Sequence, residues 1–297
     1  MTRQGNSPTL GELLEPFAQR CEQDLGRWLI EPGVPGTLAE AMRYCTLGGG
    51  KRLRPALVHM AAEACGRTGD DLTARAAAAI ELVHCCSLVH DDLPAMDDDT
   101  LRRGRPTAHV KFGQAMAILV GDALLTRAFG LLAEADDRRS VRLTCELAQA
   151  AGAAGMVAGQ VADMDLCQLP EGLEEIRFIH LRKTAAMLRA AARMGAICAD
   201  ADDKTVDALG DYAEAIGLAF QLFDDLLDVT GAAETIGKTP GKDADADKRT
   251  AAAQLGLDGA RKLGNELTDR AIASLKPLGE KADTLICLTR LLALRTH

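Results

Sequence analysis

The sequence contains few aromatic residues and few prolines. Phe, Trp and Tyr together make up 3% of its 297 residues, and no proline occurs between Pro106 and Pro170 or between Pro170 and Pro240. Aromatic side chains favour strands and proline interrupts helices, so both absences favour long helices over sheets. Alanine, the residue with the highest helix propensity, occurs 51 times. The sequence therefore predicts an all-α protein.

The chain also lacks an excess of basic residues. Lys and Arg number 34 against 43 Asp and Glu, which gives a formal net charge of −9 at pH 7. Nucleic acids and anionic membrane surfaces attract proteins through clustered positive charge. We therefore expect no nucleic-acid partner and no binding to an anionic membrane surface.

Neither a signal peptide nor a membrane span is expected. The first residues, MTRQGNSPTLGELL, lack the charged and then apolar pattern of a signal peptide. Glu81, His84 and Asp122 interrupt the longest apolar runs before they reach the roughly 20 residues that cross a bilayer. The nine cysteines are scattered without CxxC spacing, as in proteins of a reducing compartment. We therefore expect a cytoplasmic protein.

Periodic apolar residues predict about ten helices, forming one bundle with a central cavity in a single domain over residues 1–297. Asp70 and Asp202 stand before two apolar runs, as N-caps do, and Gly231 follows another as a C-terminal stop. The expected helices cover residues 8–30, 36–47, 52–66, 70–92, 114–135, 138–168, 172–199, 203–230, 256–275 and 280–295.

Three loops, at 46–55, 91–109 and 231–250, combine glycine, proline and dense charge. Loops on a rigid helical scaffold often carry the binding chemistry of a protein. These loops are therefore the expected location of a functional site.

Two clusters of aspartate follow apolar helices. The C-terminal end of a helix carries partial negative charge, which costs a carboxylate there ~0.3–1 kcal/mol. Such clusters therefore indicate a bound cation, and a ligand set of carboxylates favours Mg²⁺, with Mn²⁺ and Ca²⁺ as alternatives. For residues 97–99 taken alone, a solvated acidic loop remains the alternative. The candidate metal ligands are Asp91, Asp92 and Asp97 in the first cluster and Asp224, Asp225 and Asp228 in the second.

Basic residues near these clusters suit a phosphorylated substrate. Lys51 and Arg54 follow a run of three glycines, and Arg102 and Arg103 come shortly after the first aspartate cluster. Arginine binds diphosphate oxygens in a bidentate manner. A solvated basic turn and charge balance against the aspartates are the alternatives. Further candidates are His84, Lys183, Thr184, Lys238 and Lys248.

Together these motifs resemble the trans (all-E) isoprenyl diphosphate synthases. DDLPAMD at 91–97 and DDLLD at 224–228 are similar to the two aspartate-rich motifs of that family. GGGKRLRP at 48–55 and LRRGRPT at 101–107 resemble its basic motifs, and the similarity extends over residues 38–250.

The resemblance implies a helical bundle around a deep cavity, usually a homodimer. It also implies a reaction that joins isopentenyl diphosphate to an allylic diphosphate, head to tail, with release of diphosphate. By similarity, the aspartates named above hold three Mg²⁺ ions on the allylic diphosphate. The other implied contacts are Arg102, Lys183, Thr184, Gln221, Lys238 and Lys248 for the allylic diphosphate, and Lys51, Arg54, His84 and Arg103 for isopentenyl diphosphate.

The length of the product depends on how deep the cavity is. Ser87 and Cys86, four and five residues before Asp91, are expected just over one helical turn below the first motif. Members of the family that stop at fifteen carbons typically carry an aromatic residue at this level. Because both residues are small here, the sequence favours geranylgeranyl diphosphate as the product, with farnesyl diphosphate as the alternative.

Three other classes share parts of this pattern. A terpene cyclase has the fold and one DDxxD motif but lacks the basic set of Lys51, Arg54 and Arg103. A His-Asp phosphohydrolase is also all-α but needs more histidine ligands than His90 and its neighbours offer. A non-catalytic subunit of a heteromeric synthase tends to lose one aspartate motif, and both are intact here.

Overall fold

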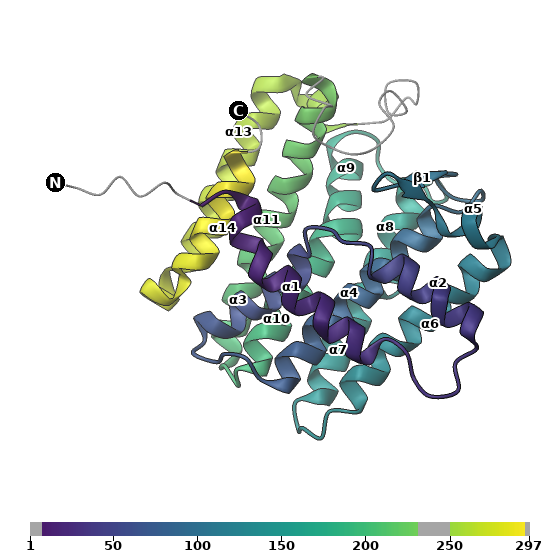
Figure 1. Ribbon diagram of the computed structural model, residues 1–297. Coiled ribbons are helices and arrows are strands. Elements are labelled where there is room, and N and C mark those ends of the chain that lie inside the picture. Colours follow the sequence, from purple (N-terminus) through teal and green to yellow (C-terminus); the bar gives the residue numbers. More distant parts are fainter. Residues whose placement is uncertain (1–7, 231–249, 295–297) are drawn as a thin grey trace.

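Helix α4 (Asp71–Asp91) runs through the middle of a helical bundle, and most of its side chains are buried (Figure 1). It packs against α3 (Leu53–Ala64), α6 (Gln114–Ala133) and α10 (Ala186–Cys198), and α10 in turn packs against α11 (Asp203–Thr230). The small side chains of its alanines let these neighbours approach closely. This computed structural model describes residues 8–230 and 250–294, with the side chains of all but 228–230.

The other elements surround this core. Helices α13 and α14 lie on one side of the bundle and a small hairpin lies on the opposite side (Figure 1). The all-α fold predicted from the sequence is confirmed. The surrounding elements are α1 (Leu10–Trp28), α2 (Gly36–Thr46), β1 (Leu101–Arg102), β2 (Arg105–Pro106), α5 (Ala108–Phe112), α7 (Ser140–Ala151), α8 (Met156–Asp163), α9 (Leu173–Ile179), the π-helical turn η1 (His180–Ala185), α13 (Ala251–Ser274), the 3₁₀ segment η3 (Lys276–Ala282) and α14 (Asp283–Ala293).

The predicted N-caps are confirmed. The carboxylate of Asp70 accepts a hydrogen bond from the amide of Thr73 at 2.9 Å, and α4 begins at the next residue. Asp202 accepts one from the amide of Thr205 at 2.8 Å, before α11. Gly231, the predicted C-terminal stop, lies outside the described residues.

The single helix expected over 138–168 is wrong, because the chain breaks between α7 and α8. At the break, the amide of Gly155 donates to the carbonyl of Gly152 at 2.9 Å. A Cβ on Gly155 would lie 2.1 Å from the carbonyl oxygen of Ala150. The turn therefore requires glycine, and the periodic apolar residues on either side concealed it.

Two helices, α4 and α6, are long and apolar enough to cross a membrane by length and composition. The apolar window of α4 is 78% buried inside the protein and that of α6 is 44% buried. The expectation that charged residues interrupt every such run is therefore wrong for these two helices. Burial within the bundle gives α4 its apolar character, and α6 has one buried and one exposed face.

Candidate active site

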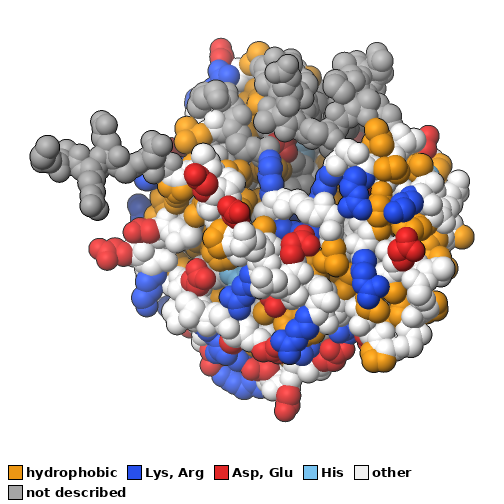
Figure 2. Space-filling view, viewed as in Figure 1, with side chains coloured by type: hydrophobic (Ala, Val, Ile, Leu, Met, Phe, Trp, Pro, Cys, Tyr) orange, Lys and Arg blue, Asp and Glu red, His pale blue; other side chains and the backbone are white. Residues whose placement is uncertain are grey.

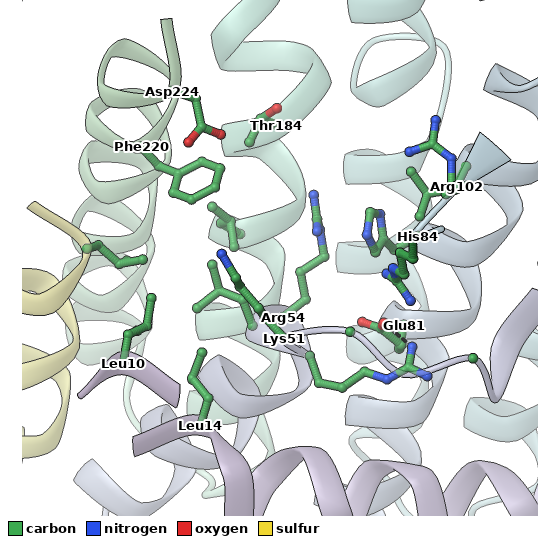
Figure 3. Close-up of a pocket in the computed structure, with 18 of the residues that line it drawn as sticks. Leu10, Leu14, Lys51, Arg54, Glu81, His84, Arg102, Thr184, Phe220 and Asp224 are labelled. Atoms are coloured by element: carbon green, nitrogen blue, oxygen red, sulfur yellow. Dashed lines mark hydrogen bonds and ion pairs between the residues drawn. The ribbon is translucent and has the colours of Figure 1, made fainter. Parts of the chain in front are cut away.

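A cavity of about 680 Å³ opens between α1, α4, α11, α14 and the loop that precedes α3. Asp224, Thr184 and Arg102 lie toward one end of it, and Leu10 and Leu14 lie at the other (Figure 3). The predicted site residues that line this cavity are Lys51, Arg54, His84, Arg102, Arg103, Thr184 and Asp224.

The first aspartate motif lies at the C-terminal end of α4. Asp91 and Asp92 are 8% and 3% exposed, whereas Asp97 is exposed. The amide of Asp97 donates to the carbonyl of Asp91 at 2.8 Å, which folds the motif back on the helix end. Burial, together with the nearby charges of Asp97 and Asp92, raises the pKa of Asp91 to about 6, and the charge of Lys183 opposes this rise. The motif thus concentrates buried negative charge, as predicted for a cation site.

The hairpin β1–β2 brings Arg102 to this motif. Its Nε donates to Oδ1 of Asp92 at 2.7 Å, and its guanidinium lies 3.6 Å from Asp99. Burial raises the pKa of Asp92, and the hydrogen bond from Arg102 opposes that rise. The hairpin turns at Arg103, whose φ is 53°, and at Gly104. Sequence reasoning did not predict these two short strands.

The second aspartate motif lies near the C-terminal end of α11. Asp224 lines the cavity, so it faces the space that the basic residues also line. Oδ2 of Asp225 instead accepts a hydrogen bond from the amide of Ala251, at the start of α13, at 3.1 Å. The side chain of Asp228 lies outside the described residues, as do Lys238 and Lys248.

The π-helical turn η1 presents Lys183 and Thr184 between α8 and α11. A Cβ on Gly159 would lie 2.3 Å from the amide nitrogen of Lys183, so the absence of a side chain lets α8 approach the turn. The hydroxyl of Thr184 donates to Oε1 of Gln221 at 2.9 Å. The structure therefore brings together Thr184 and Gln221, which lie 37 residues apart in the sequence.

Two polar residues of α8 belong to this site although sequence reasoning missed them. The amide of Gln160 donates to the carboxylate of Asp91, and Asp163 accepts a hydrogen bond from Lys183 at 2.6 Å. Gln160 and Asp163 are three residues apart, so they share one face of the helix. That spacing within an otherwise apolar segment was the signal that could have identified them.

A basic group lies on the other side of the cavity, where Lys51, Arg54 and His84 line it together with Arg103. The guanidinium of Arg103 donates to the carbonyl of Gly49. Burial and the charges of the surrounding arginines, Arg54 and Arg103 foremost, lower the pKa of His84. A neutral imidazole among guanidinium groups fits an anion site. On the face seen in Figure 2, Lys and Arg side chains gather over α2 and the hairpin.

The oxygen donors of the two aspartate motifs fit Mg²⁺. Asp91 and Asp92 are buried beside like charges, a state that a divalent cation relieves, and Asp224 supplies a further carboxylate. Across residues 8–230 and 250–294, no three His, Cys, Asp or Glu side chains are placed to hold a metal by themselves. Mg²⁺ commonly completes its coordination with water and substrate phosphate oxygens, so it needs no closed cage of protein ligands.

The two residues predicted to control product length lie on α4 near this motif. Cys86 is 5% exposed, and burial raises the pKa of its thiol to about 12, with a further contribution from Asp122 of α6. The hydroxyl of Ser87 donates to the carbonyl of His84 at 2.8 Å. The residues of α4 that line the 680 Å³ cavity are Glu81, His84 and Leu88. Cys86 is therefore placed toward α6 and away from the group of basic residues.

A helical bundle that gathers carboxylates and basic residues around a cavity is typical of enzymes that bind phosphorylated substrates through a divalent cation. The family model of polyprenyl synthetase matches residues 35–280, and the chain belongs to that family. Members of the family use Mg²⁺. This protein is a short-chain prenyl diphosphate synthase, a prenyltransferase of isoprenoid biosynthesis.

The curated relatives include synthases of two product lengths. The chain is 47% identical to farnesyl diphosphate synthase of Escherichia coli over 276 residues, which is 91% of this chain and 92% of the relative. It is 46% identical to geranylgeranyl pyrophosphate synthase 11, chloroplastic, of Arabidopsis thaliana, over 88% of this chain and 75% of the relative.

Solved structures share the fold. An FPP/GFPP synthase from Zymomonas mobilis matches with a TM-score of 0.83 and 38% identity, over 96% of this chain and 98% of that chain. A geranyltransferase from Legionella pneumophila matches with the same TM-score and 34% identity, over 97% of each chain.

Proposed function

We propose that the protein condenses isopentenyl diphosphate with an allylic diphosphate, head to tail, and releases diphosphate. The observation that carries this proposal is a single cavity bordered by groups of opposite charge. Asp224, the first residue of the second aspartate motif, lines it, whereas Arg54 and Arg103 line it beside a neutral His84. Such a cavity suits two diphosphates, one bound through metal ions and one bound by protein cations.

Breaking the allylic C–O bond leaves negative charge on the diphosphate, and groups that neutralise this charge lower the barrier. Three bound Mg²⁺ ions would supply most of that neutralisation. The proposed ligands are Asp91, Asp92, Asp97 and Asp224, with Asp225 and Asp228 as further members of the second motif.

Protein groups near η1 would hold and orient the allylic diphosphate. Lys183 and Arg102 supply positive charge, and the hydrogen bond between Thr184 and Gln221 fixes the hydroxyl beside them. Both cations pair with carboxylates in this structure, so substrate oxygens would have to compete with Asp163 and Asp92 for them. Lys238 and Lys248 are proposed as additional contacts.

Isopentenyl diphosphate would occupy the basic side of the cavity, bound by Lys51, Arg54, His84 and Arg103. The apolar residues Leu88, Leu188 and Phe220 also line the cavity. These apolar side chains would limit the access of water to an allylic carbocation and so protect it from hydrolysis.

We favour geranylgeranyl diphosphate as the product. Cys86 and Ser87 are small, and neither lines the 680 Å³ cavity, so neither side chain narrows it for a farnesyl tail. Farnesyl diphosphate is the second candidate, and the 47% identity to the farnesyl diphosphate synthase of E. coli favours it.

We also propose a cytoplasmic homodimer. Helix α6 exposes Ile118, Leu119 and Leu125, and the adjacent α7 exposes Val141, all of them more than a third accessible in the single chain. Exposed apolar side chains that gather on neighbouring helices are typical of subunit interfaces. A second copy covering this face would bury them.

The test is direct. Purified protein is incubated with Mg²⁺, isopentenyl diphosphate and dimethylallyl, geranyl or farnesyl diphosphate, and the prenyl products are sized by chromatography. A twenty-carbon product supports the proposal in full, and a fifteen-carbon product corrects the chain length only. Absence of any condensation product with all three primers would refute the proposed reaction.

A further inference from the structure

Arg52 lies between Lys51 and Arg54 in the sequence, but its own side chain is buried and 0% exposed. It is one of the few residues other than glycine with a positive φ, at 48°, and it immediately precedes α3. Its Nη1 donates to Glu81 at 2.5 Å, its Nε donates to Glu22 at 3.0 Å, and its Nη2 bonds the carbonyl of Thr46. One guanidinium thus ties the loop before α3 to α1, α2 and α4.

Glu81 is the partner that matters most for the cavity. It lies on α4 three residues before His84, is 1% exposed, and lines the cavity beside the basic group (Figure 3). A buried carboxylate is stable as an anion only when a cation neutralises it. Arg52 provides that cation in the structure.

Arg54 is the other guanidinium near this carboxylate. Burial lowers the pKa of Arg54, and the charge of Glu81 is the largest influence that opposes this lowering. Nε of Arg54 is buried, and no hydrogen-bond partner for it exists among the described residues. A buried donor without a partner is costly, and a ligand that supplies acceptor oxygens would satisfy it.

We propose that Arg52 is a positioning residue for this site. Because Arg52 forms the ion pair with Glu81, the guanidinium of Arg54 can bind the diphosphate of isopentenyl diphosphate. The inference rests on the proposed function, which assigns that substrate to the basic side of the cavity. Without Arg52, the Glu81 carboxylate would attract Arg54 and compete with the substrate for it.

The kinetics of a single and a double variant test this competition. Arg52→Gln should raise the KM for isopentenyl diphosphate about tenfold and leave the KM for the allylic diphosphate within about twofold. Adding Glu81→Gln to that variant removes the competing carboxylate and should return the KM for isopentenyl diphosphate to within about threefold of the wild-type value. A merely structural role for Arg52 predicts no such rescue.

The matched control is Glu146→Gln, which breaks the ion pair of Glu146 with Arg193 between α7 and α10. This pair is also largely buried but lies outside the cavity. The control should lower the melting temperature and leave the ratio of the two KM values unchanged. If Arg52→Gln does not fold, the double variant is compared directly with the wild type, because it leaves no unpaired buried charge at these two positions, and its KM for isopentenyl diphosphate should stay within about threefold of the wild-type value.

Two results would overturn the inference. One is an equal rise of both KM values in the folded Arg52 variant, and the other is a double variant no better than the single one. A wild-type protein that gives no prenyl product with any primer would instead refute the proposed function. The wild-type assay therefore separates the two failures.

Discussion

The ammonium group of Lys183 in the π-helical turn η1 donates a hydrogen bond to Asp163 of α8, with 2.6 Å between Nζ and Oδ2. Gly159, one turn earlier on α8, permits this close approach of the two segments. The charge of Lys183 also opposes the rise in the pKa of Asp91. Lys183 therefore belongs electrostatically to the first aspartate motif, although 92 residues separate the two in the sequence (183 − 91).

This placement predicts that removing a single basic side chain changes the KM values of the two substrates differently. Lys183→Ala should raise the KM for the allylic diphosphate about tenfold and leave that for isopentenyl diphosphate nearly unchanged. Arg103→Ala, on the opposite side of the cavity, should do the reverse. Steady-state kinetics with each substrate varied in turn checks both. Equal effects on both substrates in both variants would contradict the assignment of the two diphosphate sites.

Both aspartate motifs should be required for turnover. Asp91→Ala and Asp224→Ala each remove a carboxylate proposed to bind Mg²⁺ and should lower kcat by about a hundredfold or more. Asp136→Ala, at an exposed position beyond the end of α6, is the control and should keep wild-type turnover. Near-wild-type kcat for either motif variant at saturating Mg²⁺ would show that the metal assignment is wrong.

The raised pKa of Asp91 predicts that removing its charge stabilises the folded protein at neutral pH. A carboxyl pKa of about 6 in the folded state, above its ordinary 3.8, means that folding favours the protonated form. This contribution is fully present below about pH 4 and is lost as the pH rises through 6. At pH 7.5 in EDTA, Asp91→Asn should therefore raise the free energy of unfolding by about 1–3 kcal/mol.

Thermal unfolding of the metal-free proteins checks this sign. The variant should melt higher than the wild type at pH 7.5, and the difference should shrink toward pH 4. Asparagine retains the oxygen that accepts the hydrogen bond from Gln160, so the substitution removes the charge and keeps this hydrogen bond. A lower melting temperature for the variant at pH 7.5 would contradict the prediction.

Cys86 provides the test of product length. Cys86→Tyr places an aromatic ring one helical turn below the first motif and should shorten the main product from twenty to fifteen carbons. Chromatography of the dephosphorylated products measures this. The same substitution at Cys145, an exposed cysteine of α7, is the control. An unchanged product in the Cys86 variant would place the floor of the cavity on another residue.

The exposed face of α6 predicts the oligomeric state. Light scattering after gel filtration should give twice the chain mass of 31.5 kDa. Leu119→Glu should reduce this to one chain mass, because it places a charge where apolar side chains would be buried. Leu257→Glu on α13, also exposed in the single chain, should not. A wild-type protein that elutes with the mass of one chain would contradict the proposal.

Local sequence signals determined the helices and most of their ends. Alanine content, the spacing of prolines and the aspartate N-caps act within a few residues of where they occur, so the sequence predicted α4 and α11 closely. The motifs also indicated chemistry that the family comparison confirms at the level of a prenyl diphosphate synthase. The turn at Gly152–Gly155 was not predicted, because the apolar periodicity continues through it. The hairpin β1–β2 was not predicted, because each of its strands has only two residues.

Tertiary structure alone decided which of these residues meet. Gln160 and Asp163 reach the site because α8 packs closely on η1, and Arg52 is buried because the carboxylates of Glu22 and Glu81 converge on it from two helices. Sequence position gives no distance between side chains on different helices, and the charge state of a group depends on which neighbours surround it. The sequence therefore specified the candidate site residues, while packing determined which arginine pairs with a buried carboxylate and which is proposed to bind substrate.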